Sequence, residues 1–193
     1  MTKSGASQAR AARKSRRLTE AAVRVLHRQG VERTTLADIA READVPVGNV
    51  YYYFKTKDDL VRAALSEHDT YQNELLARLD ELADPRDRVA SLVREWISHR
   101  DEAARRGCPT GTLAMELRKR PDETLGFEAA AVYRRLLDWV ARQFRELGRP
   151  DADRLAMTLV AQYEGMSTMS NIFNDPEIIL HEGDRLLGWL GDL

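Results

Sequence analysis

The segment from 47 to 57 carries side chains of the types that contact nucleic acids. Val47, Gly48 and Asn49 shortly precede three consecutive tyrosines at 51–53. The Asn49 amide can both donate and accept hydrogen bonds, as the edge of a base requires, and Gly48 allows a backbone to come close. The tyrosines add hydroxyl groups and flat faces. Together these residues suit the reading of bases in the major groove of DNA.

A second set of side chains in this region is suited to phosphate groups. These side chains are Thr34, Thr35, Lys55 and Lys57, whose hydroxyl and ammonium groups can bind phosphate oxygens. Contacts of this kind position a protein on DNA but carry no sequence information. Because a single lysine is most often an ordinary solvated charge, the prediction rests on the combination of residues.

The three tyrosines cannot all belong to a hydrophobic core. Consecutive residues of a helix are about 100° apart around its axis, so three of them cover most of its circumference. At least one tyrosine is therefore expected to be exposed. The neighbouring Val45, Val50 and Phe54 are expected in the core instead.

The charge of the chain is unevenly distributed. Residues 1–62 contain 13 Lys and Arg against 7 Asp and Glu, a net charge of +6, whereas the whole chain carries −1. The basic N-terminal third is the candidate surface for a polyanion. Such asymmetry is also common in proteins that bind no nucleic acid, where it aids solubility.

The elements that must position these residues are all helical. Apolar residues recur with helical spacing almost throughout, so we predict an all-α protein of about nine helices. Residues 44–46 form a tight turn between two short helices, which together make a helix-turn-helix. Thr35 and Thr56 are each placed to cap the helix that follows. The expected helices span about 11–28, 36–43, 47–53, 57–82, 86–105, 113–119, 121–147, 151–173 and 177–190.

The sequence RTTLADIAREADVPVGNVYYYFKTKDDL at 33–60 closely resembles the signature of the TetR family of bacterial transcriptional regulators. The matching features are Thr35–Leu36, Ile39–Ala40, Ala43, Val45, Gly48, the run 50–55, Lys57 and Leu60. The resemblance implies a helix-turn-helix DNA-binding domain at 1–56 and a helical domain for effector binding and dimerisation at 57–193. It also implies a homodimeric regulator, usually a repressor, that binds a palindromic operator and is released by a small-molecule effector.

The family's DNA contacts carry over residue by residue. By resemblance, the base contacts fall on Val47, Gly48, Asn49 and Tyr51, and the phosphate contacts on Thr34, Thr35, Tyr52, Tyr53 and Lys57. Two positions depart from the family pattern. Asp44 stands where the family often has glycine, and Val47 stands where it often has a polar or basic side chain. A valine can pack against a thymine methyl but cannot hydrogen-bond, so the operator sequence is in question.

The single cysteine, Cys108, has two interpretations. It lies in the run GCPTGTLAMEL at 107–117, which looks like a pattern of some TetR-like regulators in which a cysteine senses electrophiles or oxidants. Arg105 and Arg106 before it and a helix start after it would favour the thiolate. The alternative is a buried, inert thiol that holds a turn, which is the commoner state of a free cysteine.

The remaining helices are expected to form an effector pocket and a dimer interface. Candidate pocket residues are apolar, aromatic or adaptable side chains from 108 onward. They are Cys108, Leu113, Leu117, Phe127, Tyr133, Leu137, Gln162, Tyr163 and Met166. The family pairs its last two helices with those of the partner subunit. That pairing would place Leu159, Tyr163, Met166, Leu186, Leu187, Trp189 and Leu190 at the interface.

Composition argues against several other classes of protein. The four histidines and Cys108 show no metal-ligand spacing, so no metal or other cofactor is expected. No apolar run is long enough to span a membrane, and a lone cysteine suits the cytoplasm. An enzyme is disfavoured because no catalytic constellation is visible. A helical protein–protein adaptor with an incidentally basic N-terminus remains the main alternative to a DNA-binding regulator.

Overall fold

The computed structural model describes residues 3–120 and 124–193, and this part of the chain contains helices and no strand. The all-α prediction is confirmed. The helices are α1 Lys3–Arg33, α2 Leu36–Glu42, α3 Val47–Tyr53, α4 Lys57–Asp80, α5 Pro85–Ser98, α6 Arg100–Arg106, α7 Pro109–Arg118, α8 Thr124–Glu146, α9 Ala152–Phe173 and α10 Glu177–Gly191.

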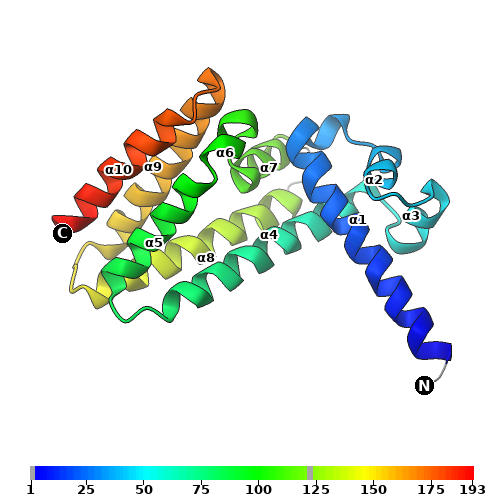
Figure 1. The fold of residues 1–193 in the computed structure, drawn as a ribbon, viewed down its shortest axis with the longest axis horizontal. Helices are drawn as coiled ribbons and strands as arrows, with labels where there is room; N and C mark the ends of the chain where they lie inside the picture. The colour runs from blue at the N-terminus through cyan, green and yellow to red at the C-terminus, as the bar shows by residue number, and fades with distance from the viewer. Residues whose placement is uncertain (1–2, 121–123) are drawn as a thin grey trace.

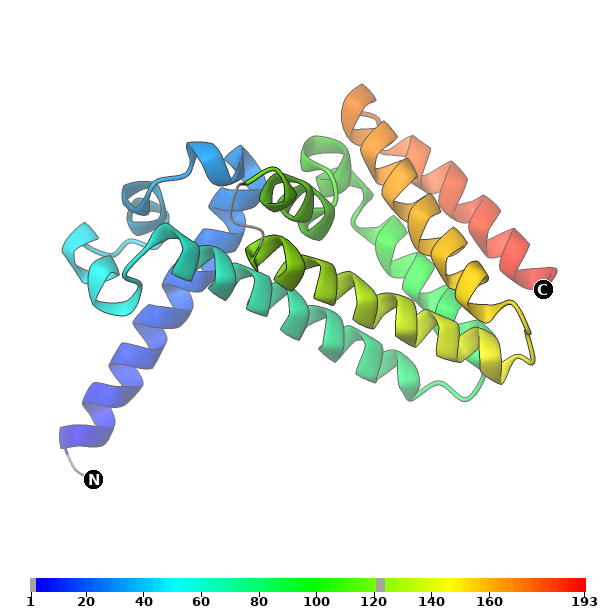
Figure 2. The ribbon, with the colours of Figure 1, turned by 180° about the vertical axis from the view of Figure 1, so that it is seen from behind.

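The molecule is elongated, with α1–α3 at one end and α9 and α10 toward the other (Figure 1). The long helices α4 and α8 run side by side and connect the two ends (Figure 2). Helix α10 packs on α5 and α9, while α1 packs on both α4 and α7. The first helix therefore lies against the body of the molecule as well as against the helix-turn-helix.

Local capping explains where helices α2 and α4 begin. The Thr35 side chain accepts a hydrogen bond from the Asp38 backbone N–H, and the Asp38 carboxylate accepts from Thr35. Thr56 and Asp59 repeat this reciprocal pair at the start of α4. Each box satisfies backbone donors that would otherwise lack a partner at a helix start. These bonds also hold the pKa of both carboxyl groups below the usual range, chiefly through the Thr35 hydroxyl in one case and the Thr56 backbone N–H in the other.

The structure refines the predicted helix outline in three places. Helix α1 spans Lys3–Arg33 rather than 11–28, with a kink at Gly30. The predicted helix 86–105 is divided at His99 into α5 and α6, because the backbone of His99 leaves helical geometry. Helix α7 begins at Pro109 rather than at 113, since proline is compatible with the first turn of a helix. The predicted start of α8 at 121 lies outside the described residues.

The described residues form two separate hydrophobic cores. One lies among α5, α8, α9, α10 and the second half of α4, around buried residues such as Phe144 and Leu159. The other joins α1–α3 to the first half of α4, to α7 and to the start of α8. Because Leu117 and Leu125 belong to this second core, the helix-turn-helix is connected to the C-terminal helices through α1, which packs on α7.

Candidate nucleic-acid interface and internal cavity

Helix α3 presents an exposed face made of adjacent residues. The side chains of Val47, Tyr51 and Tyr52 are 43%, 52% and 75% exposed. A Cβ at Gly48 would meet no atom within 4 Å, so the space beside its backbone is open. Asn49 is half-buried. The four residues expected at bases thus lie on a short helix with an accessible surface.

The opposite face of α3 anchors the helix to the core. Val50 is fully buried, and Val45 and Phe54 are nearly so, as the sequence predicted. The turn before α3 passes through Asp44, whose φ of 50° lies in the left-handed region. Arg17 donates to the Ala43 carbonyl oxygen at 2.5 Å and so ties α1 to this turn. The glycine that the family often has at 44 would adopt this backbone without strain.

Two predicted phosphate contacts have internal roles in this structure. The side chain of Thr34 is buried, and its hydroxyl donates to the Gly30 carbonyl oxygen at 2.6 Å. The prediction that Thr34 contacts phosphate is therefore corrected, because its only side-chain donor is used inside the protein. The Lys57 ammonium donates to the Val31 carbonyl oxygen at 2.8 Å, which engages it with the end of α1. Lysine and arginine favour this end of a helix because its dipole is negative there.

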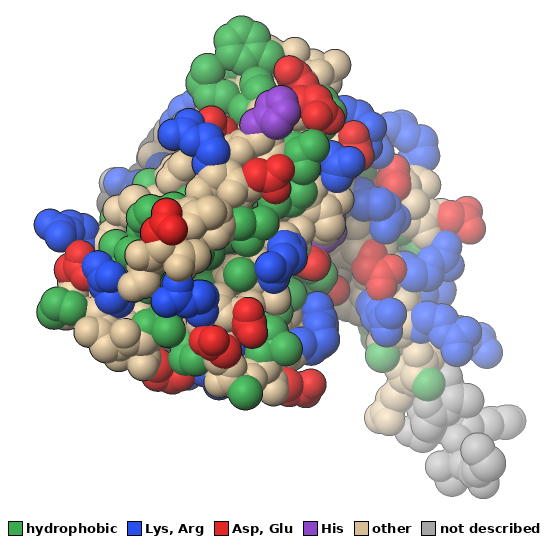
Figure 3. Space-filling model, turned by 60° about the vertical axis from the view of Figure 1, so that its left-hand side comes forward, with side chains coloured by type: hydrophobic (Ala, Val, Ile, Leu, Met, Phe, Trp, Pro, Cys, Tyr) green, Lys and Arg blue, Asp and Glu red, His purple; other side chains and the backbone are tan. Residues whose placement is uncertain are grey.

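The remaining predicted phosphate contacts lie at the surface. Thr35 is exposed, unlike Thr34, although its hydroxyl donates to Asp38 Oδ2 at 2.6 Å and would have to exchange that bond for a phosphate. Tyr52 is exposed, and Tyr53 is half-buried with its ring edge-on to Tyr52 at 5.0 Å between centroids. Lysine and arginine side chains gather on the part of the molecule that carries α1 (Figure 3, right). Arg10 and Arg13 are exposed among them. An exposed reading helix beside a basic helix is the arrangement that binding to DNA requires.

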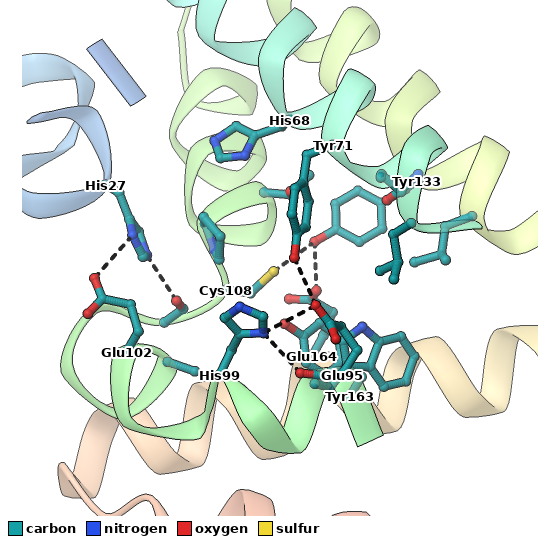
Figure 4. A pocket seen from close by; sticks show the side chains of 18 of the residues that line it. His27, His68, Tyr71, Glu95, His99, Glu102, Cys108, Tyr133, Tyr163 and Glu164 are labelled. Carbon is teal, nitrogen blue, oxygen red and sulfur yellow. Dashed lines mark hydrogen bonds and ion pairs between the residues drawn. The ribbon is translucent and has the colours of Figure 1, made fainter. Parts of the chain in front are cut away.

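A cavity of about 290 Å³ lies inside the body of the molecule, between α1 and the helices from α4 to α9 (Figure 4). Its wall combines apolar, aromatic and titratable side chains from most of the length of the chain. The lining residues are Val23, His27, His68, Tyr71, Gln72, Leu75, Leu92, Glu95, Trp96, His99, Glu102, Ala103, Gly107, Cys108, Pro109, Thr110, Tyr133, Leu136, Tyr163 and Glu164.

A chain of polar groups occupies one side of this cavity. The Tyr133 hydroxyl donates to Glu164 Oε1 at 2.7 Å and lies 3.8 Å from Cys108 Sγ. Burial raises the pKa of the Glu164 carboxyl group and of the Tyr133 hydroxyl. A Cβ at Gly111 would collide with Glu164 Oε2, so only glycine leaves room for the carboxylate here.

The surroundings of Cys108 favour the second interpretation, a buried thiol that holds a turn. Its side chain is buried, and burial together with the nearby Glu164 carboxylate raises the pKa of the thiol to about 12. Arg105 and Arg106 both turn away to pair with Glu102. The proposed thiolate sensor is corrected, because the positive charges expected to stabilise a thiolate are used elsewhere. Cys108 instead caps α7, accepting from the Gly111 backbone N–H at 3.3 Å.

Two of the three histidines at the cavity are desolvated. Burial lowers the pKa of His68 to about 4 and also lowers that of His27. His27 Nε2 lies 3.0 Å from the Gly107 carbonyl oxygen, which connects α1 to the turn before α7. Both rings are therefore neutral near pH 7 and bring no positive charge to the wall.

The predicted pocket residues divide between several surroundings. Cys108, Tyr133 and Tyr163 do line the cavity, with Tyr163 stacked on Trp96 at 4.2 Å between ring centroids. Leu113 and Leu117 are buried in the core that joins α1 to α7, so their assignment to the pocket is corrected.

Four further pocket predictions are corrected because the residues face away from the cavity. Phe127 is 56% exposed and lies under the Arg118 guanidinium. Leu137 borders a shallow surface depression. Gln162 and Met166 border a groove between α9 and α10. Each of these residues lies on a helix that contributes other residues to the cavity wall. The prediction therefore chose helices that do line the cavity, but residues on faces that do not.

Sequence analysis missed the cavity residues that come from the first half of the chain. His27 is contributed by α1, His68 and Tyr71 by α4, and Trp96 by α5. It also missed Glu164, which lies among the apolar residues of α9. A carboxylate flanked on both sides by apolar helix positions was the available signal, since such a residue is almost never fully buried without a partner.

The predicted dimer residues mostly face the interior of the protomer. Leu159, Met166, Leu186 and Leu190 are between 0% and 4% exposed and pack in the core. Leu187 and Trp189 are partly buried against the same core. The interface assignment of the four buried residues is corrected, because α5 and α8 already cover this face of α9 and α10. Tyr163 lines the cavity instead, and the assignment of Leu187 and Trp189 stays a prediction.

The apolar surface that α9 does expose lies on its other side. Met157, Met169, Ile172 and Phe173 are between 44% and 66% exposed. The small residue Gly165 lies between them and is exposed as well. The spacing of these residues, close to multiples of a helical turn, places Met157, Gly165, Met169 and Ile172 along one stripe of α9.

Comparison with known families decides the identity of the chain. Residues 18–64 match bacterial regulatory proteins of the tetR family. Residues 85–183, about half of the chain, match the C-terminal domain of LmrA/YxaF-like transcriptional regulators. The chain belongs to the TetR family. It is a transcriptional regulator with a helix-turn-helix DNA-binding domain, not an enzyme.

Individual TetR-family relatives show how far the similarity extends. The HTH-type transcriptional regulator TtgR of Pseudomonas putida is 44% identical over 84 residues, which are 43% of this chain and 37% of that protein. The chain thus matches little more than a third of that relative's length. The transcriptional regulator AcuR of Cereibacter sphaeroides is 29% identical over 185 residues, 89% of this chain and 82% of that protein.

Solved structures show the same fold. A TetR transcriptional regulator from Chloroflexus aurantiacus superposes with a TM-score of 0.83 over 94% of this chain and 96% of that one, at 22% identity. Within the described residues of this regulator, no cluster of His, Cys, Asp and Glu is placed to hold a metal ion. None of its described helices is long and apolar enough to cross a bilayer.

Proposed function

We propose that this TetR-family protein is a homodimeric repressor that binds a palindromic operator and is released by a small molecule in the internal cavity. The observation that carries this proposal is that α1 belongs to both sites. Arg17 of α1 holds the turn before the reading helix, while Val23 and His27 of the same helix line the cavity. A molecule in the cavity therefore contacts the element that positions α3.

At the operator, the exposed face of α3 enters the major groove. Asn49 and Tyr51 supply hydrogen bonds to base edges, Val47 packs against a thymine methyl, and Gly48 permits close approach of the backbone. Thr35, Tyr52 and Tyr53 bind phosphate groups on either side, and the unit at 1–56 docks as a whole. Lys57 acts indirectly, by holding the end of α1 through the Val31 carbonyl oxygen.

The dimer forms through the exposed stripe of α9. A two-fold axis would bring Met157, Met169 and Ile172 of one protomer against the same residues of its partner, which is the self-complementary form most homodimers use. Two reading helices related in this way reach successive major grooves when they are about 34–36 Å apart. A dimer seated across two grooves occludes the DNA between them, which accounts for repression.

Release follows if the ligand favours a different position of α1. The link between α1 and the cavity wall includes His27 against Gly107 and the Val31 backbone N–H, which donates to Glu116 at 2.5 Å. A ligand that moves the turn at 107 also moves α1, and this changes the spacing of the two reading helices. The ligand weakens DNA binding by its difference in affinity for the two arrangements.

Selection of bound fragments from random duplex DNA tests the DNA-binding part of the proposal. We expect a palindrome whose half-sites lie about one helical turn apart. The affinity should also fall steeply with salt, because each neutralised phosphate releases counterions. A protein–protein adaptor would enrich no sequence and show no salt-dependent DNA affinity.

Sedimentation of Ile172→Glu tests the dimer. A glutamate in the exposed stripe would place like charges across the two-fold axis, so we expect a monomer at micromolar concentration. Leu82→Glu, at an exposed position near the end of α4, is the matched control and should leave the dimer intact. A parent protein that sediments as a monomer would contradict the proposal.

A further inference from the structure

The charged side chains of the cavity wall that carry a permanent charge are all acidic. Three carboxylates, Glu95, Glu102 and Glu164, reach it, and none of the described residues that line it is lysine or arginine. The two most buried histidines, His27 and His68, are neutral near pH 7 for the reason given above. The wall therefore carries negative charge that the protein does not balance from within the cavity.

No lysine, arginine or histidine among the described residues forms an ion pair with Glu164. Glu102 pairs with Arg105 and Arg106, and Glu95 accepts from the Tyr71 hydroxyl at 2.9 Å while facing His99. The bonds of Glu164 come only from neutral groups, the Tyr133 hydroxyl at 2.7 Å and the neighbouring thiol. A half-buried carboxylate in this position gains free energy when a positive charge enters the cavity.

The rest of the wall suits the body of an organic cation. Trp96 and Tyr163 stack on one another in the wall. Tyr71, Tyr133 and Tyr163 lie near Glu164 (Figure 4). Aromatic faces carry partial negative charge and attract cations, most strongly where water is excluded. Leucines such as Leu75 and Leu92 supply apolar contact for hydrocarbon. An anion would meet carboxylates and aromatic faces, and a neutral molecule would leave Glu164 uncompensated.

We propose that the cavity takes an organic cation, an amine or quaternary ammonium with an aromatic or apolar body, and that Glu164 is its counter-charge. This inference rests on the proposed function, in that the cavity is the effector site. It adds the chemical class of the effector and the residue that selects it. Gly111 contributes to the same site, because the absence of a side chain at this position leaves space for the Glu164 carboxylate.

Two probes of the same shape but different charge show whether binding in the cavity depends on the charge of the ligand or on its shape alone. Benzyltrimethylammonium and neopentylbenzene differ only in a charged nitrogen replaced by a neutral carbon. Dissociation constants for the full-length protein can be measured by calorimetry or by the fluorescence of Trp96 in the wall. We expect the cation to bind about tenfold more tightly, because only its charged nitrogen is attracted by the Glu164 carboxylate and by the aromatic faces. Equal binding of both probes, or binding of neither, overturns the proposal.

Substitution of the carboxylate assigns the effect to Glu164. Glu164→Gln keeps the shape and removes the charge, so we expect the cation to bind about tenfold more weakly and neopentylbenzene to bind within about twofold of the parent. Glu164→Asp should keep a preference for the cation. Glu74→Gln, at an exposed position of α4, is the matched control and should change neither constant. Circular dichroism of each variant confirms folding, and undiminished cation binding by a folded Glu164→Gln overturns the role of Glu164.

Operator binding distinguishes this inference from the function on which it rests. If the ligand-free protein binds its selected operator but shows no preference for the cation, only the ligand class is wrong. If the protein binds no DNA sequence specifically, the proposed function itself fails, whatever the cavity binds. Release of operator by benzyltrimethylammonium, and not by neopentylbenzene, would support both.

Discussion

The surface of α3 and the internal cavity are built in opposite ways. The reading surface consists of residues adjacent in sequence, on a single helix whose other face is fixed in the core. The cavity wall takes residues from α1 and from the six helices α4 to α9, between positions 23 and 164. A local surface can change one residue at a time without disturbing the fold. A wall assembled from many helices changes whenever the packing between them changes.

The largest expected effect tests whether the stability of the helix-turn-helix end depends on its packing against α7. Leu117→Ala removes a fully buried side chain from the core shared by α1 and α7. We expect a loss of about 2–5 kcal/mol in the free energy of unfolding. Chemical denaturation measures it, with Met115→Ala at an exposed position of the same helix as the control. A loss of less than about 1 kcal/mol, well under the usual cost of such a cavity, would mean that the helix-turn-helix folds independently of α7.

The second effect tests whether a residue on the surface of α3 contributes to DNA binding without contributing to stability. Asn49→Ala should weaken specific operator binding by about 1–3 kcal/mol and relax the preference at one base pair, because a bidentate contact to a base is lost. The free energy of unfolding should hardly change, since the residue lies on the accessible side of α3. Binding assays on the selected operator measure the effect, and Asn73→Ala on the exposed face of α4 is the control. A stability loss with unchanged DNA affinity would reverse the assignment.

The third effect belongs to the cavity and depends on pH. Burial lowers the pKa of His68 to about 4, below the value of about 6.5 in the unfolded chain. Between these two values the unfolded state binds more protons, so stability is complete above pH 6.5 and is lost as the pH falls toward 4. We expect a loss of about 1–2 kcal/mol between about pH 7 and pH 5. In His68→Gln this loss should shrink, whereas His181→Gln, exposed on α10, should behave as the parent.

The smallest effect concerns a helix start at the border between the two regions. Thr56→Ala removes the side chain that caps α4, which should cost about 1 kcal/mol of stability. Thr70→Ala, at an exposed position inside the same helix, is the comparison and should cost less. Thermal unfolding of the two variants side by side gives the difference. Equal melting temperatures would show that the capping box at 56 contributes nothing.

The contrast also explains what the sequence could and could not predict. The helix-turn-helix follows from signals within a few residues, such as the threonine caps and the alternation of buried and exposed positions around Val50. The cavity does not, because the burial of Glu164 depends on α7 and α8, which approach α9 only in the folded chain. The sequence left the state of Cys108 open for the same reason. Its neighbours Arg105 and Arg106 are close in sequence, but in space they lie against Glu102.

The dimer residues show a further limit of sequence patterns. Apolar residues on α9 and α10 exceed what one buried face needs, but composition does not say which face the rest of the protomer covers. In the fold, α5 and α8 take the side that carries Leu159 and Leu186, and the stripe with Met157 and Ile172 remains open. Helix existence was therefore predictable, whereas helix rotation was set by packing between distant elements.

The position of Val23 and His27 has a consequence for the engineering of chimeric regulators. Such chimeras exchange the DNA-binding end of one family member for that of another in order to redirect an existing sensor to a new promoter. In this protein the exchanged piece would carry two residues of the cavity wall with it. If the cavity holds the effector, as proposed above, a chimera that replaces α1 would alter which molecule is detected as well as which DNA is bound, unless positions 23 and 27 are restored.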